Sequence, residues 1–308
     1  MSGARAVVFA YHDVGVRCLK TLLSGGVAVP LVVTVPDDPR EQQWFASVAA
    51  AAADYGLDVV APEDAHAPRL ISRVSELQPD FVFSFYYRSM LGAPLLRAAR
   101  RGALNMHGSL LPKYRGRAPV NWAILHGEPE TGATLHYMVE RADAGDIVDS
   151  QAVPILLDDD AREVFSKVTV AAETVLARSL PALIAGTAPR RPQPTLAGQY
   201  FGRRRPEDGR IDWSRSALEI HNLVRAVAPP FPGAFAKVAG ERWEIHRTRL
   251  AADISAPRDA RLFGSGGSCY LACGDGAALR LLAAANVRGP VDLAALAARA
   301  ALQPLPLG

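Results

Sequence analysis

The sequence predicts an α/β protein: a Rossmann-like, mostly parallel sheet with helices on both faces, followed by a smaller, OB-like β-barrel domain. Two observations predict this fold class. Over the first half, short apolar runs alternate with Ala- and Leu-rich stretches, a rhythm typical of βαβ units. After a Pro-rich segment at 186–194, the chain changes to short runs separated by glycine-containing turns, which is typical of a small barrel or sandwich.

Taken in order, apolar runs of the first half predict strands at 6–10, 31–35, 59–60, 81–85, 103–107, 133–138 and 147–153. The intervening stretches predict helices at 15–23, 41–55, 67–77 and 162–184, the last preceded by three aspartates that favour a helix N-terminus. The second part predicts a helix at 217–227, strands at 234–238, 243–249, 268–272 and 278–285, and a final helix at 291–301. We therefore expect an N-terminal domain at 1–188, a stiff linker at 189–204 and a barrel domain at 205–308.

The composition excludes several functional classes. With 49% hydrophobic and 21% charged residues, the chain has an ordinary globular composition. A net charge of +3, from 34 basic and 31 acidic residues, is no nucleic-acid footprint. Three scattered cysteines build neither a disulfide framework nor a zinc site. The N-terminal apolar run is too short for a signal peptide, and no uncharged run reaches membrane-spanning length. We expect a cytoplasmic protein that binds neither nucleic acid nor membrane.

The most informative stretch is 105–119, which begins with Asn105 and His107 at the end of an apolar run. Residues i and i+2 of a strand point to the same face, so an amide and an imidazole can address one substrate atom. Asp143, in a later loop, could supply a carboxylate that holds the imidazole. Such a set suits acyl transfer through a tetrahedral intermediate. The alternative is a strand-end pair satisfied by backbone hydrogen bonds and a solvated turn aspartate, and spacing alone does not choose between them.

Other motifs narrow the chemistry further. The turn after the first predicted strand, 11–16, holds one glycine, so the dinucleotide-binding fingerprint is missing and hydride transfer is disfavoured. Arg115 and Arg117 lie beside glycine in a tight loop, which suits oxyanion recognition. The run 203–205 has the same property, and in both cases solvated surface charge is the alternative.

Residues 105–119 resemble the signature of the folate-dependent formyltransferases, which act on methionyl-tRNA, glycinamide ribonucleotide or amino-sugar nucleotides. The resemblance continues through 83–88, 130–136, 141–145, 201–204 and 232–235, and weakens after about residue 250. Together these segments are most similar to the formyltransferase domain of the polymyxin-resistance enzymes that formylate UDP-4-amino-4-deoxy-L-arabinose for lipid A modification. Those enzymes continue into an NAD-dependent decarboxylase domain that this sequence lacks, so we expect a separate protein to perform any decarboxylation.

The resemblance implies 10-formyltetrahydrofolate as the donor, a 4-amino sugar nucleotide as the acceptor and no metal. His107 would be the general acid/base, Asn105 would stabilise the oxyanion, and Asp143 would raise the pKa of His107. The folate site would be lined by Ser89, Met90, Leu91, Arg117, Val139, Glu140, Arg141, Ala142 and Asp143. Arg115, Arg203 and Arg204 would bind the nucleotide phosphates.

Three alternatives remain at this stage: a methionyl-tRNA formyltransferase, a formyl-folate hydrolase and a non-catalytic binding module. The small net charge, and an excess of acid over base at 36–41, disfavour a tRNA substrate. Residues 113–115 and 121–122 also favour the sugar enzymes. The acceptor sugar, its base and the oligomeric state stay open.

Overall fold

The structure is a computed structural model that describes residues 3–36, 43–194, 199–257 and 259–308. It forms two compact units, which are described separately. The first comprises 1–119, 130–153 and 166–202, and the second comprises 120–129, 154–165 and 203–308. The break near residue 202 falls within the expected linker. Two short segments of the expected first domain, 120–129 and 154–165, group with the second unit.

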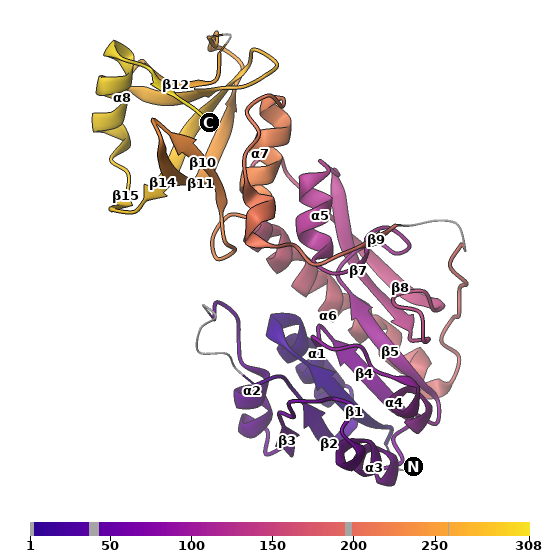
Figure 1. The fold of residues 1–308 in the computed structure, drawn as a ribbon. Coiled ribbons are helices and arrows are strands. Elements are labelled where there is room, and N and C mark those ends of the chain that lie inside the picture. The colour runs from indigo at the N-terminus through magenta and orange to yellow at the C-terminus, as the bar shows by residue number, and fades with distance from the viewer. Residues whose placement is uncertain (1–2, 37–42, 195–198, 258) are drawn as a thin grey trace. The chain divides into compact units, whose positions relative to one another are not determined.

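The first unit is built on a seven-stranded sheet with the order β3-β2-β1-β4-β5-β7-β8 (Figure 1). Its strands are β1 (Arg5–Ala10), β2 (Ala28–Val33), β3 (Val59–Val60), β4 (Phe81–Phe85), β5 (Gly102–His107), β7 (Glu130–Tyr137) and β8 (Ile147–Pro154). The pairs from β3 to β5 are parallel, whereas β7 runs antiparallel to β5. The prediction of a mostly parallel sheet is therefore confirmed.

Helices cover both faces of this sheet because its central strands are apolar on both sides. The helices are α1 (His12–Ser24), α2 (Val48–Asp54), α3 (Pro68–Glu76) and α4 (Ala93–Ala98). Side chains of α3 and α4 pack in one cluster with Val7 and Phe9 of β1. Ala6 and Val8, which point the other way, are also fully buried, and α1 packs on β1, β2 and β4.

The largest difference from the predicted elements is the helix expected at 41–55. Residues 41–42 lie outside the described residues, and α2 begins only at Val48, where the Ser47 hydroxyl caps it by accepting from the Ala50 N–H at 3.3 Å. Trp44 and Phe45 pack their rings against His12 instead, with centroid distances of 4.6 and 4.0 Å. Aromatic packing between distant segments thus prevails over helix propensity here.

The second unit contains α5 (Pro119–Leu125), α7 (Ala217–Ala226), α8 (Leu293–Leu302) and an antiparallel sheet. The sheet has the order β10-β11-β14-β13-β12-β16, made of β10 (Ala234–Val238), β11 (Glu241–Ala251), β14 (Ala278–Asn286), β13 (Ser268–Ala272), β12 (Arg261–Ser265) and β16 (Leu305–Pro306). Beyond β16, Gly308 exchanges backbone hydrogen bonds of 2.7 and 2.9 Å with Lys237 of β10. These bonds join the two edges of the curled sheet and confirm the predicted small barrel.

Helix α6 (Ala161–Ala185) is the one described helix that is long and apolar enough to cross a membrane by length and composition. Half of its most apolar window is buried inside the protein, as in the core helix of a globular fold. This observation is weak evidence for a membrane span.

Strand β12, which the sequence analysis missed, depends on a glycine. A Cβ atom on Gly264 would lie 2.1 Å from the Ala297 carbonyl oxygen of α8, so the backbones of β12 and α8 touch at this position. We expect Gly264→Ala to lower the free energy of unfolding by about 1–3 kcal/mol, the usual cost of overpacking. Chemical denaturation of both variants measures this, with Gly202→Ala as the control, because no atom lies within 4 Å of its added Cβ. Equal stability of the two variants would contradict the close packing.

Candidate functional site

The candidate site lies at the carboxyl end of β5, the edge where ligands bind in open α/β sheets. Asn105 and His107 are the fourth and last residues of this strand. Both side chains approach the same oxygen, Asp143 Oδ1, with Asn105 Nδ2 at 3.4 Å and His107 Nδ1 at 3.6 Å. The predicted common face of the two side chains is therefore present, and the structure brings the predicted carboxylate to it.

Asp143 is the centre of the site. Its Oδ1 also lies 3.6 Å from His136 Nε2, while its Oδ2 accepts a 2.8 Å hydrogen bond from the Gly116 N–H. Burial alone would raise the pKa of this carboxyl, but His107, His136 and the Gly116 N–H outweigh it and hold the pKa well below its usual range. Asp143 is therefore an anion whose charge is shared by both imidazoles and the Asn105 amide.

The hydrogen bonds of His107 assign its tautomer. Nε2 lies 2.8 Å from the Tyr114 carbonyl oxygen, which can only accept, so Nε2 carries a proton and Nδ1 is the nitrogen that titrates. Burial lowers the pKa of His107 below its ordinary value of 6.5, although Asp143 and the Tyr114 carbonyl act to raise it. The charge of Asp143, taken by itself, raises the pKa of His107, as the sequence analysis expects. The net shift is downward because the imidazole is removed from water.

His136 is a member of the site to which the sequence analysis assigned no role. Its Nδ1 lies 2.8 Å from the Tyr137 carbonyl oxygen and so carries a proton. Its Nε2 lies 3.1 Å from Asn105 Nδ2 as well as close to Asp143, so His136 contacts both of these side chains. The Asn105 Nδ2 atom lies farther from Asp143 Oδ1, at 3.4 Å. The amide hydrogen that makes this longer contact is therefore the easier one to turn toward a substrate oxygen. The strand register is the signal that identifies His136, because this residue pairs with Asn105 across β5 and β7.

The residues expected to line the folate site lie in two loops of the first unit, after β4 and after β7. In the first loop Ser89 and Met90 are exposed and Leu91 is buried. In the second, Val139, Glu140 and Arg141 are exposed and Ala142 is half-buried. Leu91 and Met138 pack into the same hydrophobic cluster, which holds the bases of the two loops together. Met90 and Val139 expose 52% and 47% of their area, so the two loops present apolar surface to solvent.

The segment 115–117 connects these loops to the candidate acid/base residues. The exposed Arg117 donates through Nη2 to the Arg88 carbonyl oxygen at 3.4 Å, and the Gly116 N–H binds Asp143. The segment of Arg117 thus contacts both Asp143 and the loop after β4, while the role of these residues in folate binding stays a prediction.

The arginines predicted to bind phosphates have different surroundings. Arg115 is only 4% exposed, and burial, more than its neighbour Arg141, lowers the pKa of its guanidinium. Its Nη2 donates to Gln193 Oε1 at 2.8 Å. Arg203 and Arg204 belong to the second unit, where Arg203 is exposed and Arg204 donates to the Asp208 carbonyl oxygen at 2.9 Å. Their proposed contacts with phosphate stay predictions.

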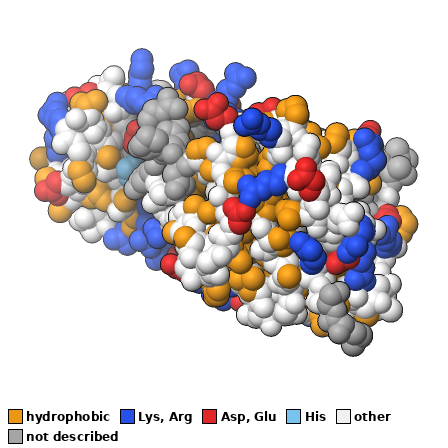
Figure 2. Space-filling model, turned by 90° about the horizontal axis from the view of Figure 1, so that it is seen from below, with side chains coloured by type: hydrophobic (Ala, Val, Ile, Leu, Met, Phe, Trp, Pro, Cys, Tyr) orange, Lys and Arg blue, Asp and Glu red, His pale blue; other side chains and the backbone are white. Residues whose placement is uncertain are grey.

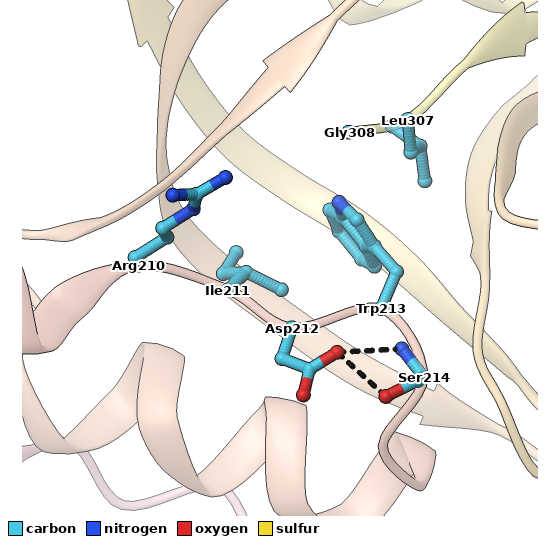
Figure 3. Close-up of a pocket in the computed structure, with 7 residues that line it drawn as sticks. All are labelled: Arg210, Ile211, Asp212, Trp213, Ser214, Leu307 and Gly308. Atoms are coloured by element: carbon cyan, nitrogen blue, oxygen red, sulfur yellow. Dashed lines mark hydrogen bonds between the residues drawn. The ribbon is translucent and has the colours of Figure 1, made fainter.

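A separate open pocket lies in the second unit, beside the barrel (Figure 3). It is lined by Arg210, Ile211, Asp212, Trp213, Ser214, Leu307 and Gly308. Figure 3 shows that the Asp212 carboxylate bonds to Ser214 of the same wall. None of the predicted site residues lines this pocket, and its Asp212–Ser214 pair is exposed to solvent.

Charge on the molecule is mixed in sign. On the face shown in Figure 2, Lys and Arg side chains lie among Asp and Glu side chains and apolar patches. This distribution agrees with the small net charge of +3. Although two imidazoles approach Asp143, no group of three His, Cys, Asp or Glu among the described residues could hold a metal ion.

The electrostatic role of Asp143 is measurable without substrate. We expect Asp143→Asn to move the pKa of His107 further below 6.5, because the carboxylate favours the protonated imidazole and its removal makes protonation harder. Histidine ring resonances followed by NMR across pH report this pKa. Asp146→Asn removes the same charge from the same loop and serves as the control. An unchanged His107 titration in Asp143→Asn would contradict the assignment of this ion pair.

Comparison with known proteins places the fold in a family. The structure superposes on WlaRD, a sugar 3N-formyl transferase solved in the presence of dTDP and 5-N-formyl-THF, with a TM-score of 0.72 at 19% identity, covering 95% of this chain and 99% of that one. An N-formyltransferase from Helicobacter canadensis, solved with folinic acid and dTDP-3-aminofucose, gives 0.69 at 20% identity, with 91% and 98% covered. A 4-N formyltransferase from Francisella tularensis gives 0.62 at 20% identity, with 76% and 93% covered.

At these identities the likeness establishes the fold alone. The family assignment comes from the sequence, which matches the formyl transferase family over residues 5–180 and the C-terminal domain of formyl transferases over residues 204–292. The first match spans more than half of the chain and includes Asn105, His107 and Asp143. This chain therefore belongs to the formyl transferase family.

Proposed function

We propose that the protein transfers a formyl group from 10-formyltetrahydrofolate to the amine of a 4-amino sugar nucleotide. The observation that carries the proposal is the convergence of Asn105, His107 and Asp143 at the carboxyl end of β5, where an amide and an imidazole each lie within 3.6 Å of one carboxylate oxygen. Family membership supplies formyl transfer as the reaction class. Relatives of the same fold that were solved with 5-N-formyl-THF or folinic acid support a reduced folate as the donor.

The residues of the two donor loops fit such a group. A pterin ring is flat and largely apolar on its faces, and the half-exposed Met90 and Val139 offer the matching apolar surface. Arg117 lies exposed between the loops and can pair with a carboxylate of a folate tail. The bound donor supplies an activated formyl carbon, and the protein supplies orientation and proton transfer.

The acid/base role of His107 follows from its tautomer. Because burial keeps the imidazole neutral near pH 7, Nδ1 can take the proton that the acceptor amine loses on attack. Asp143 Oδ1, at 3.6 Å, stabilises the imidazolium that forms. The same Nδ1–H can then protonate the leaving nitrogen, so one histidine returns to its starting state in each cycle. General acid/base catalysis of this kind usually contributes about 10²–10⁴-fold.

Asn105 acts on the other charge that develops, the negative charge on the formyl oxygen. Its Nδ2 bonds to His136 on one side, and the hydrogen that makes the longer contact to Asp143 can turn to the substrate oxygen. Such a donor stabilises the transition state more than the ground state, because the oxygen is most negative there.

The identity of the acceptor sugar nucleotide is the most specific part of the proposal. The motif at 105–119 and its companions most resemble enzymes that act on UDP-4-amino-4-deoxy-L-arabinose, which we propose as the acceptor, in lipid A modification. The Francisella tularensis relative is a 4-N formyltransferase, whereas the relatives solved with dTDP or dTDP-3-aminofucose suggest a thymine nucleotide and a 3-amine as competing choices.

We expect His107→Ala and Asn105→Ala each to reduce formyl transfer by about a hundredfold or more, because each removes a group that acts only in the transition state. The measurement is the release of tetrahydrofolate at saturating donor and acceptor. His246→Ala is the matched control, since the one side-chain bond of His246 within the described part of the chain is to Glu244 on its own strand of the barrel. Unfolding midpoints of all three variants check that the fold is retained. Wild-type turnover in either site variant would exclude this mechanism.

The acceptor is tested with a panel under one donor condition. We expect the highest kcat/KM with UDP-4-amino-4-deoxy-L-arabinose and lower values with dTDP-4-amino-6-deoxyhexoses and dTDP-3-amino sugars. Robust turnover with initiator methionyl-tRNA alone would overturn the sugar assignment, and donor consumption without any amine would identify a hydrolase. Arg203→Ala and Arg204→Ala are expected to raise the acceptor KM and to leave the donor KM unchanged.

A further inference from the structure

We propose that Gln193 is a positioning residue for formyl transfer: its side-chain amide holds the backbone of the loop that presents Asp143 to His107 and Asn105. This inference rests on the proposed function. Gln193 lies in the Pro-rich segment that the sequence predicts to be a linker, and no motif of the sequence assigns it a role.

Gln193 binds the loop with both hydrogens of its amide nitrogen. Nε2 donates to the Asp143 carbonyl oxygen at 3.0 Å and to the Gly145 carbonyl oxygen at 2.7 Å, while Oε1 accepts from Arg115 Nη2 at 2.8 Å. The opposite orientation of the amide would set its oxygen against two carbonyls and its nitrogen against a guanidinium. Only one orientation is therefore compatible with these neighbours, and Arg115 selects it.

The loop needs such a restraint because its backbone is unusual. Asp143 has a φ of 52°, in the left-handed region that side chains other than glycine seldom adopt, and such conformations persist only when the surroundings hold them. Two residues later, Gly145 approaches the Tyr137 backbone so closely that a Cβ would lie 1.9 Å from the carbonyl oxygen. The Gln193 side chain acts as a clamp on this stretch, since it binds the carbonyls of Asp143 and Gly145, on both sides of residue 144.

Gln193 is itself held in place. Arg191 exchanges backbone hydrogen bonds of 2.8 and 3.0 Å with Ile147 at the start of β8, which fixes the segment two residues earlier. Pro192 and Pro194 flank Gln193, so its backbone has little freedom to lose when the clamp forms. The predicted linker is therefore a rigid part of the first unit at this position.

The clamp and the Gly116 N–H restrain Asp143 from two directions. Gln193 fixes its main chain, and the 2.8 Å bond from Gly116 fixes its Oδ2, while Arg115 supports both because it precedes Gly116 and orients Gln193. A shift of the loop would move Oδ1 away from His107 and Asn105. Besides His107 and Arg115, His136 on β7 lies near this carboxylate, and Arg141 on the loop itself interacts with Arg115.

The test uses Gln193→Met, which keeps the length of the side chain and removes all three hydrogen bonds. We expect kcat to fall about 10- to 100-fold, as for a misplaced catalytic group, with KM for both substrates within about threefold of wild type. We also expect a lower His107 pKa in NMR titration without substrates, because Asp143 no longer lies close to the ring. Gln193→Glu, which still accepts from Arg115 but cannot donate to the carbonyls, is expected to lower kcat in the same way.

Gln151→Met is the control, since Gln151 lies on β8 and, among the residues that the structure describes, its side chain bonds to the Ala152 carbonyl and Arg178 alone. A wild-type His107 titration in Gln193→Met, or a loss confined to KM, would overturn the inference. A change in thermal stability alone, with kcat unchanged, would also overturn the inference. If wild-type protein formylates none of the acceptors, the proposed function fails, whereas the titration of His107 still decides whether Gln193 positions Asp143.

Discussion

A single partly buried carboxylate, that of Asp143, organises the candidate site. Removing a charge from water is costly unless partners compensate it. Among the described residues, both carboxylate oxygens of Asp143 have such partners. One oxygen faces His107, His136 and the Asn105 amide, and the other accepts from the Gly116 N–H. The Tyr114 and Tyr137 carbonyl oxygens each accept from the far nitrogen of one imidazole, which turns the other ring nitrogen toward the anion. The arrangement of the candidate site residues follows from these contacts.

The sheet topology explains how these groups meet. β5 ends at His107, and β7 returns beside it in the antiparallel direction, which sets His136 opposite Asn105. The loop after β7 then carries Asp143 back to the same edge, with a left-handed residue and a glycine at its tightest part. The one antiparallel neighbour of an otherwise parallel core thus brings a second histidine and a carboxylate to the strand that bears the first histidine.

Burial lowers the pKa of His107 and the ion pair with Asp143 raises it, and the balance between the two effects suits proton transfer. A fully solvent-exposed imidazole beside Asp143 would be largely protonated near neutral pH and could not accept a proton. Burial lowers its pKa and favours the neutral ring that the proposed mechanism needs when the amine attacks, and the carboxylate is in place to stabilise the charge that would then form. The same groups would therefore serve both halves of a proton relay within one site.

Much of this could be predicted locally. The alternation of apolar runs and helical stretches determined the α/β class, and the two-residue period of a strand placed Asn105 and His107 on one face, because both depend only on neighbours in the chain. The start of α2 could not be predicted, because Trp44 and Phe45 pack on His12. The net pKa shift of His107 and the roles of His136 and Gln193 also required the tertiary structure. Burial, cross-strand register and side-chain bonds to distant carbonyls join segments far apart in the sequence, and such contacts leave no periodic pattern along it. A Pro-rich stretch that reads as a linker in the sequence is, in three dimensions, what holds the loop of Asp143.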